Sequence, residues 1–128
     1  MLMETLTIRE ASEFTGLSAH TLRYYERIGL IDPVARNAGG HRRYVQTDLE
    51  HLMFLNCLRD TGMPIQRMQE FASLTSQGRA TMQTRLDLLE AHRSDVQAHI
   101  QELEEKLAII EAKIKRFSQV ESEKVGDS

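Results

Sequence analysis

The chain has 128 residues, a formal net charge of −3 and an aromatic share of 5%, with no tryptophan. This length fits one ordinary domain, or a small domain joined to an extended element, and the low aromatic share argues against a large globular core. No apolar run is long enough to span a bilayer and no secretory leader is evident, so we expect a cytoplasmic protein without membrane contacts. The single cysteine, Cys57, cannot form an intrachain disulfide, which fits the same reducing compartment.

The charge is unevenly distributed along the chain. Residues 18–43 contain five arginines and two acids, a net charge of +3, so the remainder carries −6. The overall acidity argues against indiscriminate nucleic-acid binding, where an excess of basic residues is usual. A local basic patch on an acidic protein instead indicates a partner held in one orientation at one face.

Two short helices separated by a tight turn are predicted near the N-terminus. Thr7 and Glu10 have the spacing of a capping box that opens a two-turn helix. Gly16 suits the corner after it, Ser18 suits the N-cap of the second helix, and Gly29 suits the position just past its end. The apolar side of the first helix would consist of Ile8, Ala11 and Phe14. Helix, glycine-containing turn and helix is the helix-turn-helix pattern, in which the second helix reads the DNA major groove.

Residues 34–45 are predicted to form a small basic wing after the second helix. They resemble a β-hairpin with a Gly-Gly tip and short arms near 34–36 and 43–45. Its cationic side chains, which could reach DNA phosphates, are Arg36, His41, Arg42 and Arg43. The alternative is a basic loop in water, but the position directly after a helix-turn-helix favours the wing.

The rest of the chain is predicted to be helical. Thr47 and Glu50 form a second possible capping box before an apolar helix, and Pro64 fits the first turn of a helix over 65–75. Three methionines of this connector are expected to fill the core: Met53, Met63 and Met68. We therefore expect a mostly α protein with a winged helix-turn-helix over 1–46, a two-helix connector over 47–78, a long dimerisation helix over 79–118 and a flexible tail over 119–128.

The predicted dimerisation helix carries a strict four–three repeat. Eleven positions from Met82 to Phe117 follow this spacing over five heptads, and ten are apolar, the exception being Arg93. Such a helix is on the order of 54 Å long, too long to bury its stripe on so small a domain. It should pair with a second copy, with Arg93 fixing the register.

The motifs together resemble the MerR family of bacterial transcription regulators. The resemblance covers roughly residues 5–117 and rests on Leu-Arg-Tyr-Tyr-Glu-Arg-Ile-Gly-Leu at 22–30, Gly-His-Arg-Arg-Tyr at 40–44 and the long terminal helix. It implies a homodimer joined by an antiparallel coiled coil and bound to double-stranded promoter DNA with an over-long spacer. In that family, effector binding makes the dimer bend and untwist the promoter, so that RNA polymerase engages both of its elements.

The resemblance also implies particular DNA contacts. On the reading helix these are Ser18, His20, Thr21, Arg23 and Tyr25, with Tyr24 assigned to packing, although spacing does not separate the two tyrosines. On the wing they are Arg36, His41 and Arg42, with Tyr44 bracing the wing. His41 stands where many members have tyrosine or another polar residue.

The effector stays open between two alternatives: an electrophile sensed at Cys57, or another small effector or none with Cys57 inert. The chain lacks the cysteines of metal-responsive and iron–sulfur members, and His92 and His99 are seven residues apart, so no metal and no cofactor are expected. Cys57 lies in a context similar to the thiol-responsive branch, which answers electrophile stress. Against this, a lone helical cysteine is usually inert, and its neighbours one turn away, which include Asp60, supply no cation to activate a thiol.

No constellation of catalytic side chains is present in the sequence, so an enzyme is not expected. The main interpretation is a dimeric DNA-binding regulator. The rival is a coiled-coil interaction module whose helix-turn-helix does not bind DNA.

Overall fold

The computed structural model describes residues 4–126, with side chains through Lys124. Residues 1–3 of the expected DNA-binding domain and 127–128 of the expected tail lie outside this range. The helices are α1 (Ile8–Thr15), α2 (Ala19–Arg27), α3 (Gln46–Asp60), α4 (Ile65–Ser76), the short 3-10 helix η1 (Arg79–Thr81) and α5 (Met82–Gly126). The chain divides into two compact units, Met1–Glu90 and Ala91–Ser128. The first unit contains α1–α4 and the start of α5, and the second contains the remainder of α5.

The predicted helix-turn-helix is confirmed. Glu10 accepts a hydrogen bond from the backbone amide of Thr7 at 3.0 Å, and the Thr7 hydroxyl accepts one from the amide of Glu10 at 3.1 Å. Gly16 ends α1 in a left-handed conformation with φ of 76°, and the Ser18 hydroxyl caps α2 by accepting a hydrogen bond from the amide of Thr21 at 3.0 Å. The local sequence therefore fixes the corner between the two helices.

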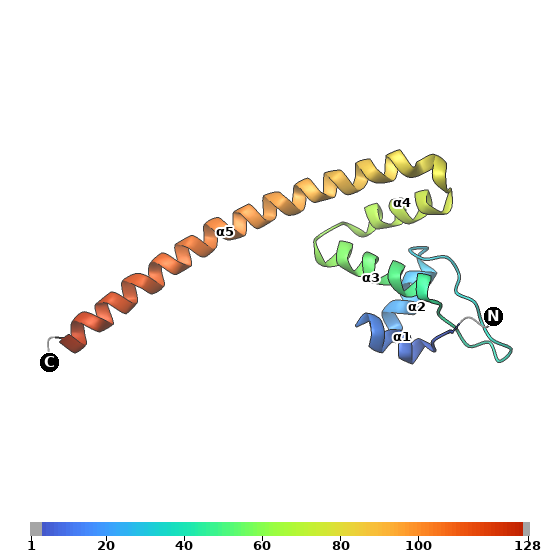
Figure 1. The fold of residues 1–128 in the computed structure, drawn as a ribbon, viewed down its shortest axis with the longest axis horizontal. Coiled ribbons are helices and arrows are strands. Elements are labelled where there is room, and N and C mark those ends of the chain that lie inside the picture. Colours follow the sequence, from blue (N-terminus) through green and yellow to red (C-terminus); the bar gives the residue numbers. More distant parts are fainter. Residues whose placement is uncertain (1–3, 127–128) are drawn as a thin grey trace. The chain divides into compact units, whose positions relative to one another are not determined.

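The core of the first unit joins α1 and α2 to the connector helices. α1 contacts both α2 and α3, and α3 is followed by α4 (Figure 1). Fully buried side chains from these segments include Ala11, Leu22, Tyr25, Leu30, Tyr44, Leu52, Leu55 and Met68. Of the expected apolar side of α1, Ala11 is fully buried, whereas Phe14 is 53% exposed. This core holds the reading helix by one face and leaves its other face open.

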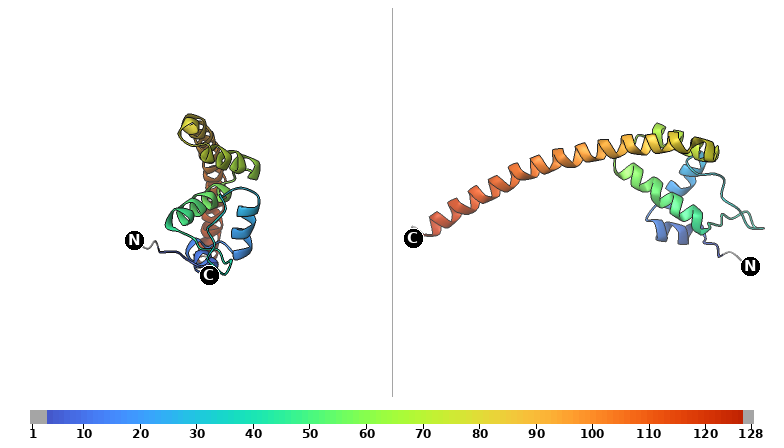
Figure 2. Two further views of the ribbon diagram at one scale, coloured as in Figure 1. Left: turned by 90° about the vertical axis from the view of Figure 1, so that its right-hand side faces the viewer. Right: turned by 45° about the horizontal axis from the view of Figure 1, so that its top comes forward.

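The wing is a tight hairpin without a regular strand in the described range, and Figure 2 shows it within the extended loop between α2 and α3. Arg36 and Arg42 form an antiparallel bridge, and the amide of Asn37 donates to the carbonyl of His41 at 2.9 Å. Tyr44, expected to lie in the second arm, instead pairs with Leu6 before α1, through hydrogen bonds of 2.7 and 2.8 Å. The chain entering α1 thus supports the base of the wing.

The connector begins earlier than predicted. α3 starts at Gln46, and Asp48 accepts a hydrogen bond from the amide of Val45 at 2.9 Å, so the expected capping box at Thr47 is wrong. Asp48 is favoured because it occupies the third helical position, where its carboxylate can reach back to that amide. The helix predicted over 65–75 is confirmed as α4.

The three connector methionines differ in burial. Met63 and Met68 are buried as expected, whereas Met53 is 47% exposed, so its assignment to the core is wrong.

α5 continues beyond the predicted end of the dimerisation helix at residue 118 and remains helical to Gly126, so the expectation of a flexible tail is wrong for residues 119–126. Within the first unit, Leu89 packs against the core. Within the second unit, the heptad stripe is open, with exposures of 49–62% for Ile100, Leu103, Leu107, Ile110, Ile114 and Phe117. None of the helices in the described range is long and apolar enough to cross a membrane.

Candidate nucleic-acid interface

The open face of α2 carries cationic, aromatic and polar side chains. His20, Arg23, Tyr24 and Arg27 are exposed, whereas Thr21 is half-buried, with its hydroxyl accepting a hydrogen bond from the capping Ser18 hydroxyl at 2.9 Å. The guanidinium of Arg27 lies 5.4 Å from the centre of the Tyr24 ring, within cation–π range. This face has the composition of a helix that reads base edges and phosphates in the major groove.

The burial of the two tyrosines is the reverse of what was expected. Tyr25, assigned to DNA, is only 2% exposed, and its hydroxyl accepts a hydrogen bond from Arg59 of α3 at 3.1 Å. Tyr24, assigned to packing, is 38% exposed. The assignment of Tyr24 to packing and of Tyr25 to the open face is therefore wrong, because the burial stripe of α2 runs through Leu22 and Tyr25.

The wing arginines differ in their partners. The Nη1 of Arg36 donates to the carbonyl of Gly40 at 3.0 Å, and both Arg36 and His41 are exposed. The Nε of Arg42 donates to Oε2 of Glu26 at 2.9 Å, with side-chain exposures of 20% and 11%. Arg43 reaches the hydroxyl and the carbonyl of Thr5 at 2.9 and 3.1 Å. Arg36 and His41 are thus the more open wing cations, while Arg42 and Arg43 also hold the wing in place.

A cleft of about 370 Å³ lies between the start of α1, the reading helix and the wing. It is lined by Thr7, Ile8, Arg23, Arg36, Asn37, Gly40, His41, Arg42 and Arg43. Four of these are arginines and none is an acid, which suits the phosphate backbone of a nucleic acid. The structure thus brings together Arg23, Arg36, His41 and Arg42 of the predicted contacts. Arg43 was predicted to be able to reach phosphates but was not among the assigned DNA contacts. Thr7 was predicted only as a helix cap, because local spacing does not show which segments meet around the wing.

Tyr44 lies inside the wing base. It is fully buried, burial raises its pKa, and its hydroxyl has no hydrogen-bond partner among the described residues. This position agrees with a brace and leaves no surface for direct contact with DNA.

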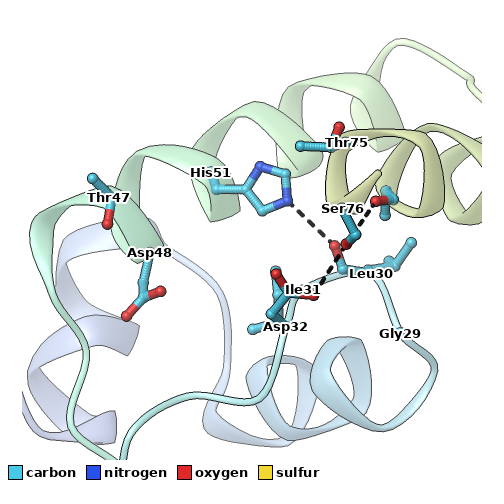
Figure 3. A pocket seen from close by; sticks show the side chains of 10 residues that line it. Gly29, Leu30, Ile31, Asp32, Thr47, Asp48, His51, Thr75 and Ser76 are labelled. Atoms are coloured by element: carbon cyan, nitrogen blue, oxygen red, sulfur yellow. Dashed lines mark hydrogen bonds between the residues drawn. The ribbon is translucent and has the colours of Figure 1, made fainter. Parts of the chain in front are cut away.

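A second, smaller pocket of about 210 Å³ lies where the end of the reading helix meets α3 and α4 (Figure 3). The carbonyl of Leu30 accepts a hydrogen bond from Nε2 of His51 at 3.3 Å, and the hydroxyl of Ser76 lies 3.2 Å from a carboxylate oxygen of Asp32, to which it donates (Figure 3). The side-chain amide of Gln69 on α4 donates to the carbonyl of Ile28 at 3.0 Å. The connector therefore holds the C-terminal end of α2 through polar contacts.

The thiol of Cys57 is free and exposed on α3. Within the described range, no group of three or more histidine, cysteine and acidic side chains is arranged to hold a metal ion.

Comparisons with known proteins place these features in one family. Residues 6–74 match the model of the MerR HTH family regulatory proteins, and residues 49–108 match the MerR DNA-binding model. An HTH-type transcriptional regulator from Haemophilus influenzae is 39% identical over 110 residues, which cover 86% of this chain and 82% of that protein.

Two solved structures are similar over most of the chain. HiNmlR, a MerR family regulator lacking the sensor domain and bound to promoter DNA, has a TM-score of 0.84 at 36% identity, covering 92% of this chain and 94% of that one. A MerR family regulator from Bacillus thuringiensis has a TM-score of 0.78 at 32% identity, covering 88% and 98%. With the helix-turn-helix, the arginine-lined cleft and the long terminal helix, these matches show that the chain belongs to the MerR family of DNA-binding transcription regulators.

Proposed function

We propose that this protein acts as a homodimer that deforms a promoter with an over-long spacer and so controls its use by RNA polymerase. The open apolar stripe of α5 is the observation that carries this proposal. Fully burying one such side chain contributes about 1.5–3 kcal/mol, so a stripe of half-exposed residues favours association with a second copy. An antiparallel pairing of two stripes, with Arg93 as the polar residue that fixes register, presents two reading helices to a pseudo-palindromic site.

Each reading helix enters the major groove with Arg23 and Tyr24 foremost, while Arg36 and His41 of the wing contact phosphates. The DNA contact first expected for Tyr25 is assigned to Tyr24, because Tyr24 is the exposed member of the pair. His20 and the half-buried Thr21 complete the open face of the helix near its capped start. Binding by the two DNA-binding domains of a dimer favours a promoter that bends and untwists at its centre. The energy needed to deform the DNA depends on its sequence, so it contributes to the choice of promoter. The similar protein HiNmlR is bound to promoter DNA, which supports this choice of partner.

The effector is proposed to be an electrophile that reacts with Cys57. The exposure of this thiol supports access by a small reagent. The alternative is a regulator with an inert Cys57 that answers another effector or none. In either case the protein acts by binding and not by catalysis, in the bacterial cytoplasm, where it is associated with the nucleoid when bound to DNA.

Fluorescence anisotropy with a labelled double-stranded fragment from the region beside its own gene tests the proposal. We expect binding at about 10⁻⁸ M or tighter. Arg23→Ala should weaken it and reduce the magnitude of the slope of log affinity against log salt by about two, one for each subunit of the dimer. Arg116→Ala, which removes an equal charge from α5, is the matched control. No binding by the wild-type protein would favour the interaction module, and unchanged binding by Arg23→Ala would overturn the assigned reading face.

Deformation needs a separate measurement. A series of promoter fragments that differ only in spacer length should show the strongest transcription response to the protein at an over-long spacer. An equal response at every spacer length would contradict the deformation mechanism.

A further inference from the structure

Glu26 is an acid in the helix that reads DNA, and its carboxylate faces the wing. One oxygen, Oε2, accepts a hydrogen bond from Nε of Arg42 at 2.9 Å, and the other, Oε1, accepts one from the backbone amide of Val34 at 3.3 Å. Val34 directly precedes the first arm of the hairpin and Arg42 lies in its second arm. A single side chain on the reading helix therefore holds both the start of the wing and its second arm.

This contact is well shielded from water. The side chain of Glu26 is 11% exposed and that of Arg42 is 20% exposed. Removing one partner of a shielded ion pair leaves the other charge without compensation, which costs more than the loss of a surface pair. The backbone hairpin closes the wing on itself, whereas the Glu26 carboxylate joins it to α2.

The alignment between wing and helix decides which DNA groups can be contacted together. Arg23 comes from α2 and Arg36 from the wing, and both line the same cleft. We propose that Glu26 is a positioning residue for DNA recognition, which fixes the wing against the reading helix so that these two arginines engage the DNA simultaneously. This inference rests on the DNA binding described above.

Simple electrostatics predicts the opposite effect of removing this carboxylate. DNA is negatively charged, so loss of an acid from the reading helix should strengthen binding and free Arg42 for a phosphate. Positioning predicts weaker binding, because the wing loses its fixed alignment. The sign of the change in affinity therefore separates the two accounts.

The experiment measures anisotropy of the same labelled promoter fragment with wild type, Glu26→Gln, Arg36→Ala and the double variant. We expect Glu26→Gln to weaken binding about tenfold, within the range of coupling between contacting groups. In the Arg36→Ala background the same substitution should have little further effect, because without Arg36 the wing has already lost its main DNA contact, whether or not Glu26 aligns it. Glu13→Gln removes an exposed acid from α1 and serves as the control for charge alone.

Equal or tighter binding by Glu26→Gln would overturn the inference. It would also be overturned if the fold loss of affinity in the double variant equalled the product of the fold losses in the two single variants. Thermal melting shows whether Glu26→Gln is folded. If it is not, Arg42→Lys keeps the positive charge but loses the Nε donor, and it should weaken binding with the same dependence on Arg36. Unchanged affinity in Arg42→Lys would then overturn the inference. Absence of DNA binding by the wild-type protein would overturn the proposed function as well, whereas wild-type binding with an unaffected Glu26→Gln overturns the positioning role alone.

Discussion

Arg59 of α3 donates a hydrogen bond to the hydroxyl of Tyr25 on the reading helix, with 3.1 Å between the two atoms. The same guanidinium donates to the side chain of Asn56 at 2.6 Å, so it is already fixed on α3. Through this contact the connector holds the buried face of α2, the helix whose other face is exposed.

Substituting the two tyrosines separately should give opposite results. Tyr25→Phe removes the acceptor for Arg59 and should lower the free energy of unfolding by about 1 kcal/mol. Tyr24→Ala should weaken promoter binding, since it removes the exposed ring and its contact with Arg27. Chemical denaturation and anisotropy on both variants check these outcomes. Stronger loss of DNA binding in Tyr25→Phe than in Tyr24→Ala would restore the original assignment.

The capping box of α1 should make part of the stability depend on pH. Hydrogen bonding to Thr7, first to its backbone amide and second to its side chain, lowers the pKa of Glu10 below its ordinary value. The contribution is therefore fully present above the pKa of the unfolded chain, and it is lost as the pH falls through the lower folded-state value. Glu10→Gln should melt at a lower temperature than wild type near neutral pH, and the difference should disappear in strong acid.

Thr7→Ala tests the other half of the same capping box, at a cost of about 1 kcal/mol. Melting curves over a series of pH values measure both variants. A difference between wild type and Glu10→Gln that grew on acidification would contradict this account.

Association through α5 should depend on its apolar stripe. Leu107→Asp places a charge in the middle of the stripe, and the variant should sediment as a monomer and bind the promoter at least tenfold more weakly, because the two heads are no longer linked. Ala98→Asp adds the same charge to a position outside the repeat and should remain a dimer. Analytical ultracentrifugation distinguishes monomer from dimer for all three proteins. A monomeric wild-type protein would refute the coiled coil itself.

Cys57 can be tested without disturbing DNA recognition. Cys57→Ala should bind the promoter within about twofold of wild type, since surface substitutions usually change stability little. Induction of a reporter gene by an aldehyde should be abolished in this variant, and mass spectrometry should detect the adduct only in wild type. A normal response in Cys57→Ala would establish that the thiol is inert.

Local sequence was enough to predict most of the helices. The pairs Thr7–Glu10 and Ser18–Thr21 are set by neighbouring residues, so their spacing predicts the helix starts. The start of α3 was missed because the spacing of Thr47 and Glu50 suggested a capping box there, whereas Asp48 accepts the hydrogen bond from the amide of Val45.

Residues of the interface that depend on long-range pairing could not be predicted. Tyr24 and Tyr25 are adjacent and chemically alike, and their burial is decided by Arg59 and the core beneath α2. Arg42 reads as one more basic residue of the wing, yet its partner Glu26 lies sixteen positions away. Composition predicted a basic surface, but it did not distinguish the arginines that hold the wing from those that remain free to bind.

The mutual backbone pairing of Leu6 and Tyr44 closes the DNA-reading part of the chain into a loop whose entrance and exit coincide. Such a segment is suited to exchange between related proteins, because its two ends lie together and can be joined to a new connector at a single place. A graft of residues 6–44 would have to retain the docking partners of Tyr25, Ile28 and Leu30 on the recipient's connector. DNA preference would then be inherited separately from the connector and from α5.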